Sequence, residues 1–146
     1  MKSTSGFAFI DPYGATVNWR YLKQRTVAKS MADAEFNATA IAAEEGIWLQ
    51  KVQTELYPSI SCQEKESKPY IQLFKNNQAC IASLMNGKFR ASRWHVGVRY
   101  FWLREILGMG EAEREYIRTD EMVAEGMTKA LEKTKHELFF AMLGIY

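Results

Sequence analysis

The stretch PYIQLFKNNQACIASLM, residues 69–85, decides the fold class. Its first part, PYIQLF (69–74), is a short apolar run of strand length, and its last part, ACIASLM (79–85), has helical character. A strand that leads directly into a helix is typical of mixed α/β folds, which often place functional groups where the strand ends. Here the strand ends at two amides, Asn76 and Asn77. The stretch therefore predicts an α/β fold, and its end is either a polar turn or an active site that has lost its acid.

The residues at the start of the chain predict a β-hairpin. SGFAFI (5–10) is apolar on both faces, as in a buried strand, and DPYG (11–14) has Pro and Gly at the places that a turn prefers. ATVNWRYL (15–22) alternates between apolar and polar residues, which indicates a half-buried strand. Its expected apolar face consists of Val17, Trp19 and Tyr21.

Helical patterns dominate the rest of the chain. A long helix is expected over 28–56, with an apolar stripe at three- and four-residue spacing: Met31, Ala34, Ala38, Ile41, Trp48, Val52 and Leu56. The later expected elements are a polar loop at 57–69, a strand at 70–74, helices at 77–86 and 92–110, a strand at 111–118 and a helix at 120–143. The expected stripe of the last helix is Met122, Met127, Leu131, Leu138 and Met142. This order favours a mixed β-sheet covered by helices.

The composition fits one folded domain, residues 1–146, with 47% hydrophobic and 13% aromatic residues. No apolar run reaches the roughly 18 residues of a membrane helix, and the first residues do not form a convincing signal peptide. The cysteines Cys62 and Cys80 make neither a disulfide framework nor a zinc site, which favours reduced thiols in the cytoplasm or nucleus. The net charge of +2 by itself implies no polyanionic partner.

Five stretches, in order along nearly the whole chain, match the motifs of one family. KSTSGFAF (2–9) is similar to Lys-Ser-Thr-Ser-Gly-Tyr, and the helical stretch 27–56 to a helix with Ser-Thr-Thr-Glu-Ala-Glu-Tyr. NNQACIA (76–82) is similar to Asp-Asn-Gln-Ser-Ala-Ile-Ala. SRWHVGVRYFWLRE (92–105) is similar to a segment that begins Arg-Thr-Lys-His, and AEGMTKAL (124–131) to Ala-Asp-Ile-Leu-Thr-Lys-Pro-Leu. Together they resemble the ribonuclease H domain of copia-type (LTR) retrotransposon polyproteins.

The resemblance implies a ribonuclease H-like fold, in which a five-stranded mixed sheet has helices on both faces and begins with three antiparallel strands. This sequence has only two expected strands before the long helix. The family's first strand, which carries its first catalytic Asp, would lie upstream of Met1. Because that strand is central in the family's sheet, we expect an open slot with unpaired backbone groups that a partner strand fills.

The family hydrolyses phosphodiesters with two divalent cations, which four carboxylates hold. By position, the family's helix acid corresponds to Glu35, its strand-end acid to Asn76, and its fourth acid to Glu125, which is longer by a methylene. The first acid has no counterpart. The resemblance therefore predicts a pseudoenzyme in which these three residues are remnants and no metal binds, with magnesium as cofactor only if the nuclease hypothesis holds. Glu35 is also compatible with an ordinary carboxylate on a solvated helix face.

Cationic and aromatic residues alternate between positions 88 and 104, and cations beside aromatic rings suit phosphate contact and base stacking. The candidate nucleic-acid contacts are Arg90, Arg93, Trp94, Arg99 and Arg104. The alternative is that the aromatic residues form core while the arginines are solvated, which helical spacing favours.

Three functions follow from these patterns. The first is a domesticated interaction module without catalysis, which forms a homodimer or takes a partner strand into the missing first-strand position. The second is a non-cleaving binder of RNA–DNA hybrids or other nucleic acid. The third is a metal-dependent ribonuclease H that another chain completes. A membrane partner is not expected, because the apolar C-terminal stretch 131–143 has both charge signs on its polar face.

Overall fold

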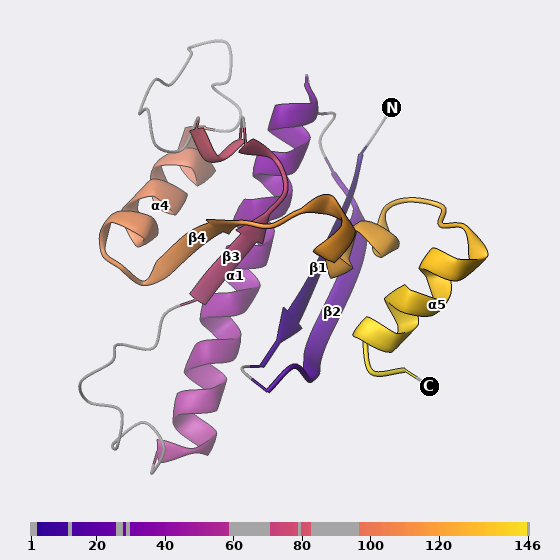
Figure 1. The fold of residues 1–146 in the computed structure, drawn as a ribbon. Helices are drawn as coiled ribbons and strands as arrows, with labels where there is room; N and C mark the ends of the chain where they lie inside the picture. The colour runs from indigo at the N-terminus through magenta and orange to yellow at the C-terminus, as the bar shows by residue number, and fades with distance from the viewer. Residues whose placement is uncertain are drawn as a thin grey trace.

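A computed structural model describes residues 3–11, 13–25, 28, 30–58, 71–78, 80–82 and 97–145. Within these residues the chain has a mixed α/β fold, as expected (Figure 1). The strands form two small sheets: β1 (Thr4–Ile10) pairs antiparallel with β2 (Thr16–Lys23), and β3 (Ile71–Lys75) pairs parallel with β4 (Ala112–Tyr116).

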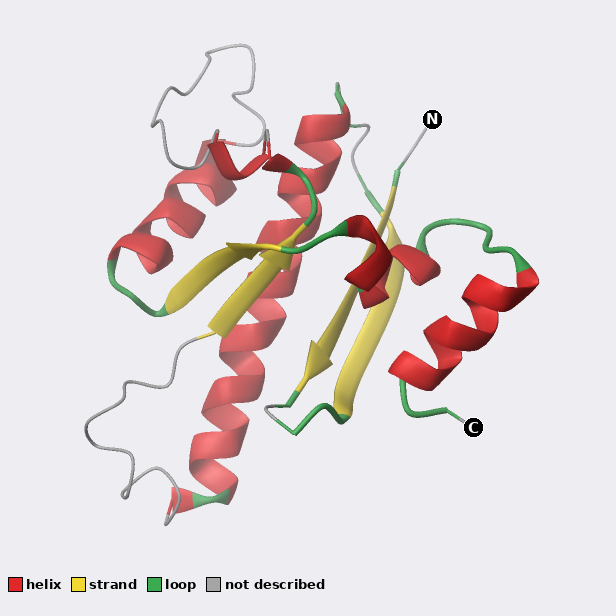
Figure 2. Ribbon diagram, in the orientation of Figure 1, coloured by secondary structure: helices red, strands yellow, loops and turns green. Residues whose placement is uncertain are grey.

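The expectation of one continuous mixed sheet is therefore wrong for the described residues, because two separate two-stranded sheets are present. The expected strands are all found, and β4 confirms the weak strand signal at 111–118. The physical reason for the split is that no described strand lies between β1 and β3 to join their edges. Figure 2 shows the two pairs of strands separated in this way.

The turn of the β1–β2 hairpin is held by Asp11, whose Oδ1 accepts hydrogen bonds from the backbone N–H of Tyr13 at 2.9 Å and of Ala15 at 2.8 Å. Gly14 follows with a positive φ of 88°, which glycine adopts without steric cost. The strand β2 is half-buried, as expected, but on the other face: Thr16, Asn18 and Leu22 are partly buried, whereas the apolar row is exposed, Val17 by 60%, Trp19 by 50% and Tyr21 by 70%.

The face opposite that row is directed at helix α1 (Met31–Leu56), where Arg20 of β2 forms an ion pair with Glu45. The helix begins at Ser30, whose Oγ accepts from the backbone N–H of Asp33 at 3.1 Å. A Cβ on Gly46 of α1 would lie 3.1 Å from the ring of Phe9 and 3.2 Å from Ile71. The helix therefore crosses β1 and β3 at close range, and it backs both sheets.

The buried face of α1 differs from the expected stripe. Met31 is 83% exposed and Trp48 57% exposed, although both were expected in the core. The buried positions are Asp33, Phe36, Asn37, Thr39, Ala40, Ala43 and Gly46. The difference arises because β3 and helix α4 (Gly97–Gly108) pack on this side of α1.

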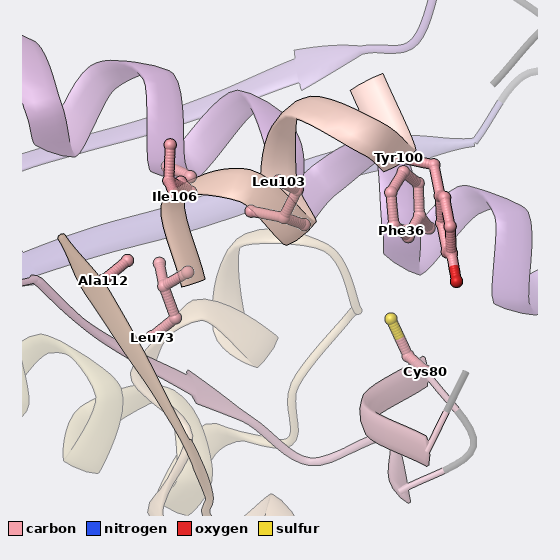
Figure 3. Close-up of a cluster of buried hydrophobic side chains, with 8 residues drawn as sticks. Phe36, Leu73, Cys80, Tyr100, Leu103, Ile106 and Ala112 are labelled. Carbon is pink, nitrogen blue, oxygen red and sulfur yellow. The ribbon is translucent and has the colours of Figure 1, made fainter. Parts of the chain in front are cut away.

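The main core lies where α1, α4, β3 and β4 meet (Figure 3). Leu103 of α4 is completely buried at its centre. The other buried members are Phe36, Ala43, Leu73, Cys80, Tyr100, Ile106 and Ala112. The helix expected over 92–110 is thus confirmed for Gly97–Gly108, while its first five positions and Cys62 lie outside the described residues.

The C-terminal region departs most from expectation. In place of one helix over 120–143, two 3₁₀ turns, η2 (Thr119–Glu121) and η3 (Val123–Met127), precede a short helix α5 (Lys133–Met142). The chain folds back because α5 packs on η3: a Cβ on Gly126 would lie 2.4 Å from the ring of Phe139. Of the expected stripe, Leu138 is 54% exposed. None of the described helices combines the length and apolarity needed to cross a bilayer.

Candidate functional site

A cavity of about 260 Å³ lies between β1 and β3, against α1. Its wall includes the start of β1 (Ser3–Gly6), the end of β3 with Leu73 and Lys75, and residues of η3. Figure 1 shows β1 and β3 as the inner strands, with β2 and β4 on their outer sides. Because the first residues of β1 and the last residues of β3 border the same cavity, these two strands run in opposite directions.

The cavity brings together the three positions that the resemblance assigns to metal-binding acids. Glu35 of α1, Asn76 after β3 and Glu125 of η3 all line it. Their assembly follows from the topology, because β3 ends beside the first turns of α1 and η3 packs on β1. The three residues therefore share one cavity, and the hydrogen-bond and ionic partners of their side chains determine what the cavity can bind.

Glu35 is held by a lysine. The Nζ of Lys75 donates to Glu35 Oε2 at 2.9 Å and to the main-chain oxygen of Glu35 at 3.0 Å. The side chain of Lys75 is only 8% exposed, whereas that of Glu35 is 39% exposed. Glu35 therefore forms an ion pair that joins α1 to β3, and its carboxylate keeps access to water, as the alternative of a carboxylate on a solvated helix face predicts.

The two amides after β3 have different roles. Asn77 Oδ1 accepts from the backbone N–H of Cys80 at 3.0 Å, so Asn77 caps the helical turn that follows. Asn76 lines the cavity and makes a long contact of 3.5 Å from its Nδ2 to Thr119 Oγ1. Asn77 is thus the polar turn residue, whereas Asn76 lines the cavity.

Glu125 also has a cationic partner. Its Oε1 accepts from the Nζ of Lys129, one helical turn later in the chain. The side chain of Glu125 is 16% exposed and that of Lys129 is 65% exposed. This pair is local, and both of its residues line the cavity.

These contacts balance the charges of the cavity. Its two carboxylates, Glu35 and Glu125, each bind one lysine ammonium, and Asn76 is neutral. Within the described part of the chain, no group of three or more His, Cys, Asp or Glu side chains is placed to hold a metal ion. Magnesium requires several anionic or carbonyl oxygens, so the donor set around the cavity does not fit a pair of divalent cations.

Of the candidate nucleic-acid contacts, the two that the structure describes, Arg99 and Arg104, do not line this cavity. Arg99 and Arg104 are exposed on α4, and the guanidinium of Arg104 lies 5.8 Å from the ring centroid of Tyr100. The aromatic residues of α4 differ in burial. Tyr100 belongs to the core, as expected if the aromatic residues are structural, whereas Phe101 is 58% exposed. The other candidates, Arg90, Arg93 and Trp94, lie outside the described residues.

Sequence reasoning missed the two lysines, Lys75 and Lys129. A signal for Lys75 was present, because Ile71, Leu73 and Lys75 alternate on one face of a strand whose Leu73 is buried. A lysine on a buried strand face needs a charged partner. The partner, Glu35, is 40 residues away and could not be identified without the fold.

Comparisons with known proteins agree with part of the resemblance. The chain is 30% identical over 145 residues to the retrovirus-related Pol polyprotein from transposon TNT 1-94 of Nicotiana tabacum, which covers 99% of this chain and 10% of that polyprotein. It is 22% identical over 129 residues to the Pol polyprotein from transposon RE1 of Arabidopsis thaliana, covering 88% of this chain and 8% of that protein. Its homologues are retrotransposon Pol polyproteins.

The chain spans about a tenth of the length of these Pol polyproteins. A shorter match, 46% identical over 48 residues, is to secreted RxLR effector protein 161 of Plasmopara viticola, and it covers a third of each chain. No protein-family model and no solved structure matches the chain. The retrotransposon origin expected from the motifs is thus confirmed at the level of the Pol polyprotein.

Proposed function

We propose that this chain is a ribonuclease H-like domain of retrotransposon origin that does not cleave nucleic acid and acts through protein contacts. One observation carries the proposal: the three positions expected to bind metal line one cavity, and both carboxylates that remain there are paired with lysines. The homology to Pol polyproteins supports the origin, and the ion pairs support the loss of catalysis.

Two-metal hydrolysis needs anions that neutralise the cations and position the attacking water. In this cavity the strand-end position is the neutral Asn76, and the charges of Glu35 and Glu125 are balanced by Lys75 and Lys129. Replacing Asn76 by Asp therefore restores only one acid. We expect no cleavage of an RNA–DNA hybrid by the Asn76→Asp protein in magnesium, and cleavage by it would contradict the proposal.

The protein contact that we propose is an extended segment in the space between β1 and β3. Each of these strands has one strand partner among the described residues, so the edges that border the cavity are available for pairing. A segment inserted here would run antiparallel to one strand and parallel to the other. Small side chains on α1 leave room for it: Ala34, Ala38 and Ala42.

A second copy of this chain is the proposed source of that segment, so the domain associates with itself. Light scattering after size exclusion, over a range of protein concentrations, tests this. We expect the unaltered chain to be a dimer. The Ala38→Trp variant should be a monomer, because the larger side chain fills the cavity. Glu44→Trp is the matched control on the exposed side of α1 and leaves the dimer intact. A monomer at every concentration for the unaltered chain would contradict self-association.

Binding of nucleic acid without cleavage is a second candidate, supported by the exposed cations Arg99 and Arg104 beside the exposed ring of Phe101. A labelled RNA–DNA hybrid titrated at two salt concentrations tests it. Binding that weakens as salt rises, and weakens further in the double variant Arg99→Ala/Arg104→Ala, would support this candidate. Lys51→Ala, an exposed lysine on α1, is the control. No binding at the lower salt concentration rejects it.

A third candidate is a ribonuclease H completed by another chain that supplies the missing acid. It predicts magnesium-dependent cleavage when a peptide corresponding to the family's first strand is added. That result would overturn the proposal that catalysis is lost, whereas binding of the peptide without cleavage would support the interaction module.

A further inference from the structure

The last residue of β3, Lys75, is unusual for a lysine because it is only 6% exposed. Lysine is seldom buried unless its charge is paired. Its Nζ makes both of its hydrogen bonds to one residue, Glu35, at 2.9 Å to Oε2 and 3.0 Å to the main-chain oxygen. These contacts fix the ammonium at one point in the wall of the cavity.

That position is chemically informative, because the carboxylate of Glu35 is the one acid of the cavity that matches the family's motif without change. A divalent cation at this carboxylate would have to displace or approach the Lys75 ammonium, and like charges at such distances repel strongly in a partly desolvated site. The other carboxylate, Glu125, is bound by Lys129 and so does not supply a free negative charge.

We propose that the ammonium of Lys75 takes the place of a divalent cation: it is the permanent counter-ion of Glu35, and it excludes metal ions from the cavity. The inference rests on the proposed function in one respect, since it takes Glu35 and Asn76 as remnants of a metal site. It goes further by assigning the exclusion to one residue that no motif identifies. Removal of the ammonium leaves the Glu35 carboxylate unbalanced in a cavity that Asn76 also lines, and a carboxylate with a nearby oxygen donor is a weak site for Mg²⁺ or Mn²⁺.

Thermal unfolding with and without millimolar Mn²⁺ or Mg²⁺ tests the proposal. We expect the unaltered protein to unfold at the same temperature in both conditions. The Lys75→Met protein should unfold at a lower temperature than the unaltered protein, and added cation should raise that temperature by about 4 °C, because a ligand that binds only the folded state stabilises it. Lys75→Gln removes the charge while keeping a hydrogen-bond donor, and it serves if Lys75→Met does not fold.

Two controls isolate the charge. Lys75→Arg keeps a cation and should show no response to metal. The double variant Lys75→Met/Glu35→Gln lacks the carboxylate and should show none either. A metal response of the unaltered protein that Glu35→Gln abolishes would overturn the inference, and so would no response in folded Lys75→Met or Lys75→Gln. Cleavage of an RNA–DNA hybrid by the unaltered protein is a different result, which would contradict the proposed function rather than this inference alone.

Discussion

The two sides of helix α1 differ in how completely the rest of the chain covers them. One side, with Phe36 and Ala43, packs into the core formed with β3, β4 and α4. The adjoining side, with Ala34, Ala38 and Ala42, borders the cavity between β1 and β3. The two sides belong to one helix, so the difference comes from what packs against each. The first side is covered by β3, β4 and α4, whereas the second faces the space between the edges of β1 and β3.

The two sides of α1 are also stabilised by different interactions. The covered side is stabilised by burial of apolar side chains, whereas the cavity side is held by the ion pair Lys75–Glu35. Core packing gives large stability effects for single changes, and ion pairs with partial access to water give small ones. The following variants measure that contrast, in order of expected effect.

Leu103→Ala should have the largest effect, because this side chain is completely buried between α4 and α1. We expect the free energy of unfolding to fall by about 3 kcal/mol, from lost burial and from the cavity left behind. Urea unfolding followed by circular dichroism measures it. Leu138→Ala on α5, where the leucine is 54% exposed, is the control and should change the midpoint little. Equal effects would mean that α4 does not form the core.

Ala43→Leu and Ala38→Leu place the same larger side chain on the two sides of α1. Ala43 is completely buried, so we expect overpacking to cost about 2 kcal/mol. Ala38 borders the cavity, which has room for the added atoms, so the stability should change by less than about 0.5 kcal/mol. Urea unfolding of both proteins checks the difference. Similar losses for both variants would show that the cavity side is packed as tightly as the core.

Glu35→Gln should destabilise the protein by about 1 kcal/mol, because it leaves the Lys75 ammonium without an anionic partner. The loss stays below that of a fully buried pair since the Glu35 side chain is 39% exposed and water reaches it. Denaturant unfolding at neutral pH provides the measurement. A neutral or stabilising effect would indicate that the pair does not hold α1 to β3.

Lys129→Ala should have the smallest effect, less than about 0.5 kcal/mol, because the Lys129 side chain is 65% exposed and pairs with Glu125 only one turn away. The same unfolding measurement applies. A loss as large as that of Glu35→Gln would remove the distinction between the two ion pairs and make Glu125 an equal anchor of the cavity.

The local elements were largely predictable because short-range patterns determine them. The alternation of β2, the helical spacing of α1 and the strand-to-helix stretch at 69–85 all gave the correct element type where the structure describes them. Which side of an element is buried was less predictable, because it depends on neighbours far away in sequence. Trp19, for example, is 50% exposed although it belongs to the apolar row of β2, and no local pattern indicates this.

The candidate site shows the same limit. Family motifs identified Glu35, Asn76 and Glu125, and the structure places all three around one cavity. Their ionic partners were not predicted, because the Lys75–Glu35 pair joins a strand to a helix across 40 residues. The motifs thus singled out three residues that share a cavity, whereas the lysines that balance the charges of Glu35 and Glu125 could be identified only from the fold.

The loss of catalysis can be measured as cleavage of an RNA–DNA hybrid by the purified chain in magnesium, and separately in manganese. We expect no product above that of a protein-free control, and no difference between the unaltered chain and its Glu35→Ala variant. Magnesium-dependent product that Glu35→Ala abolishes would show the opposite, because the carboxylate paired with Lys75 would then still bind a metal.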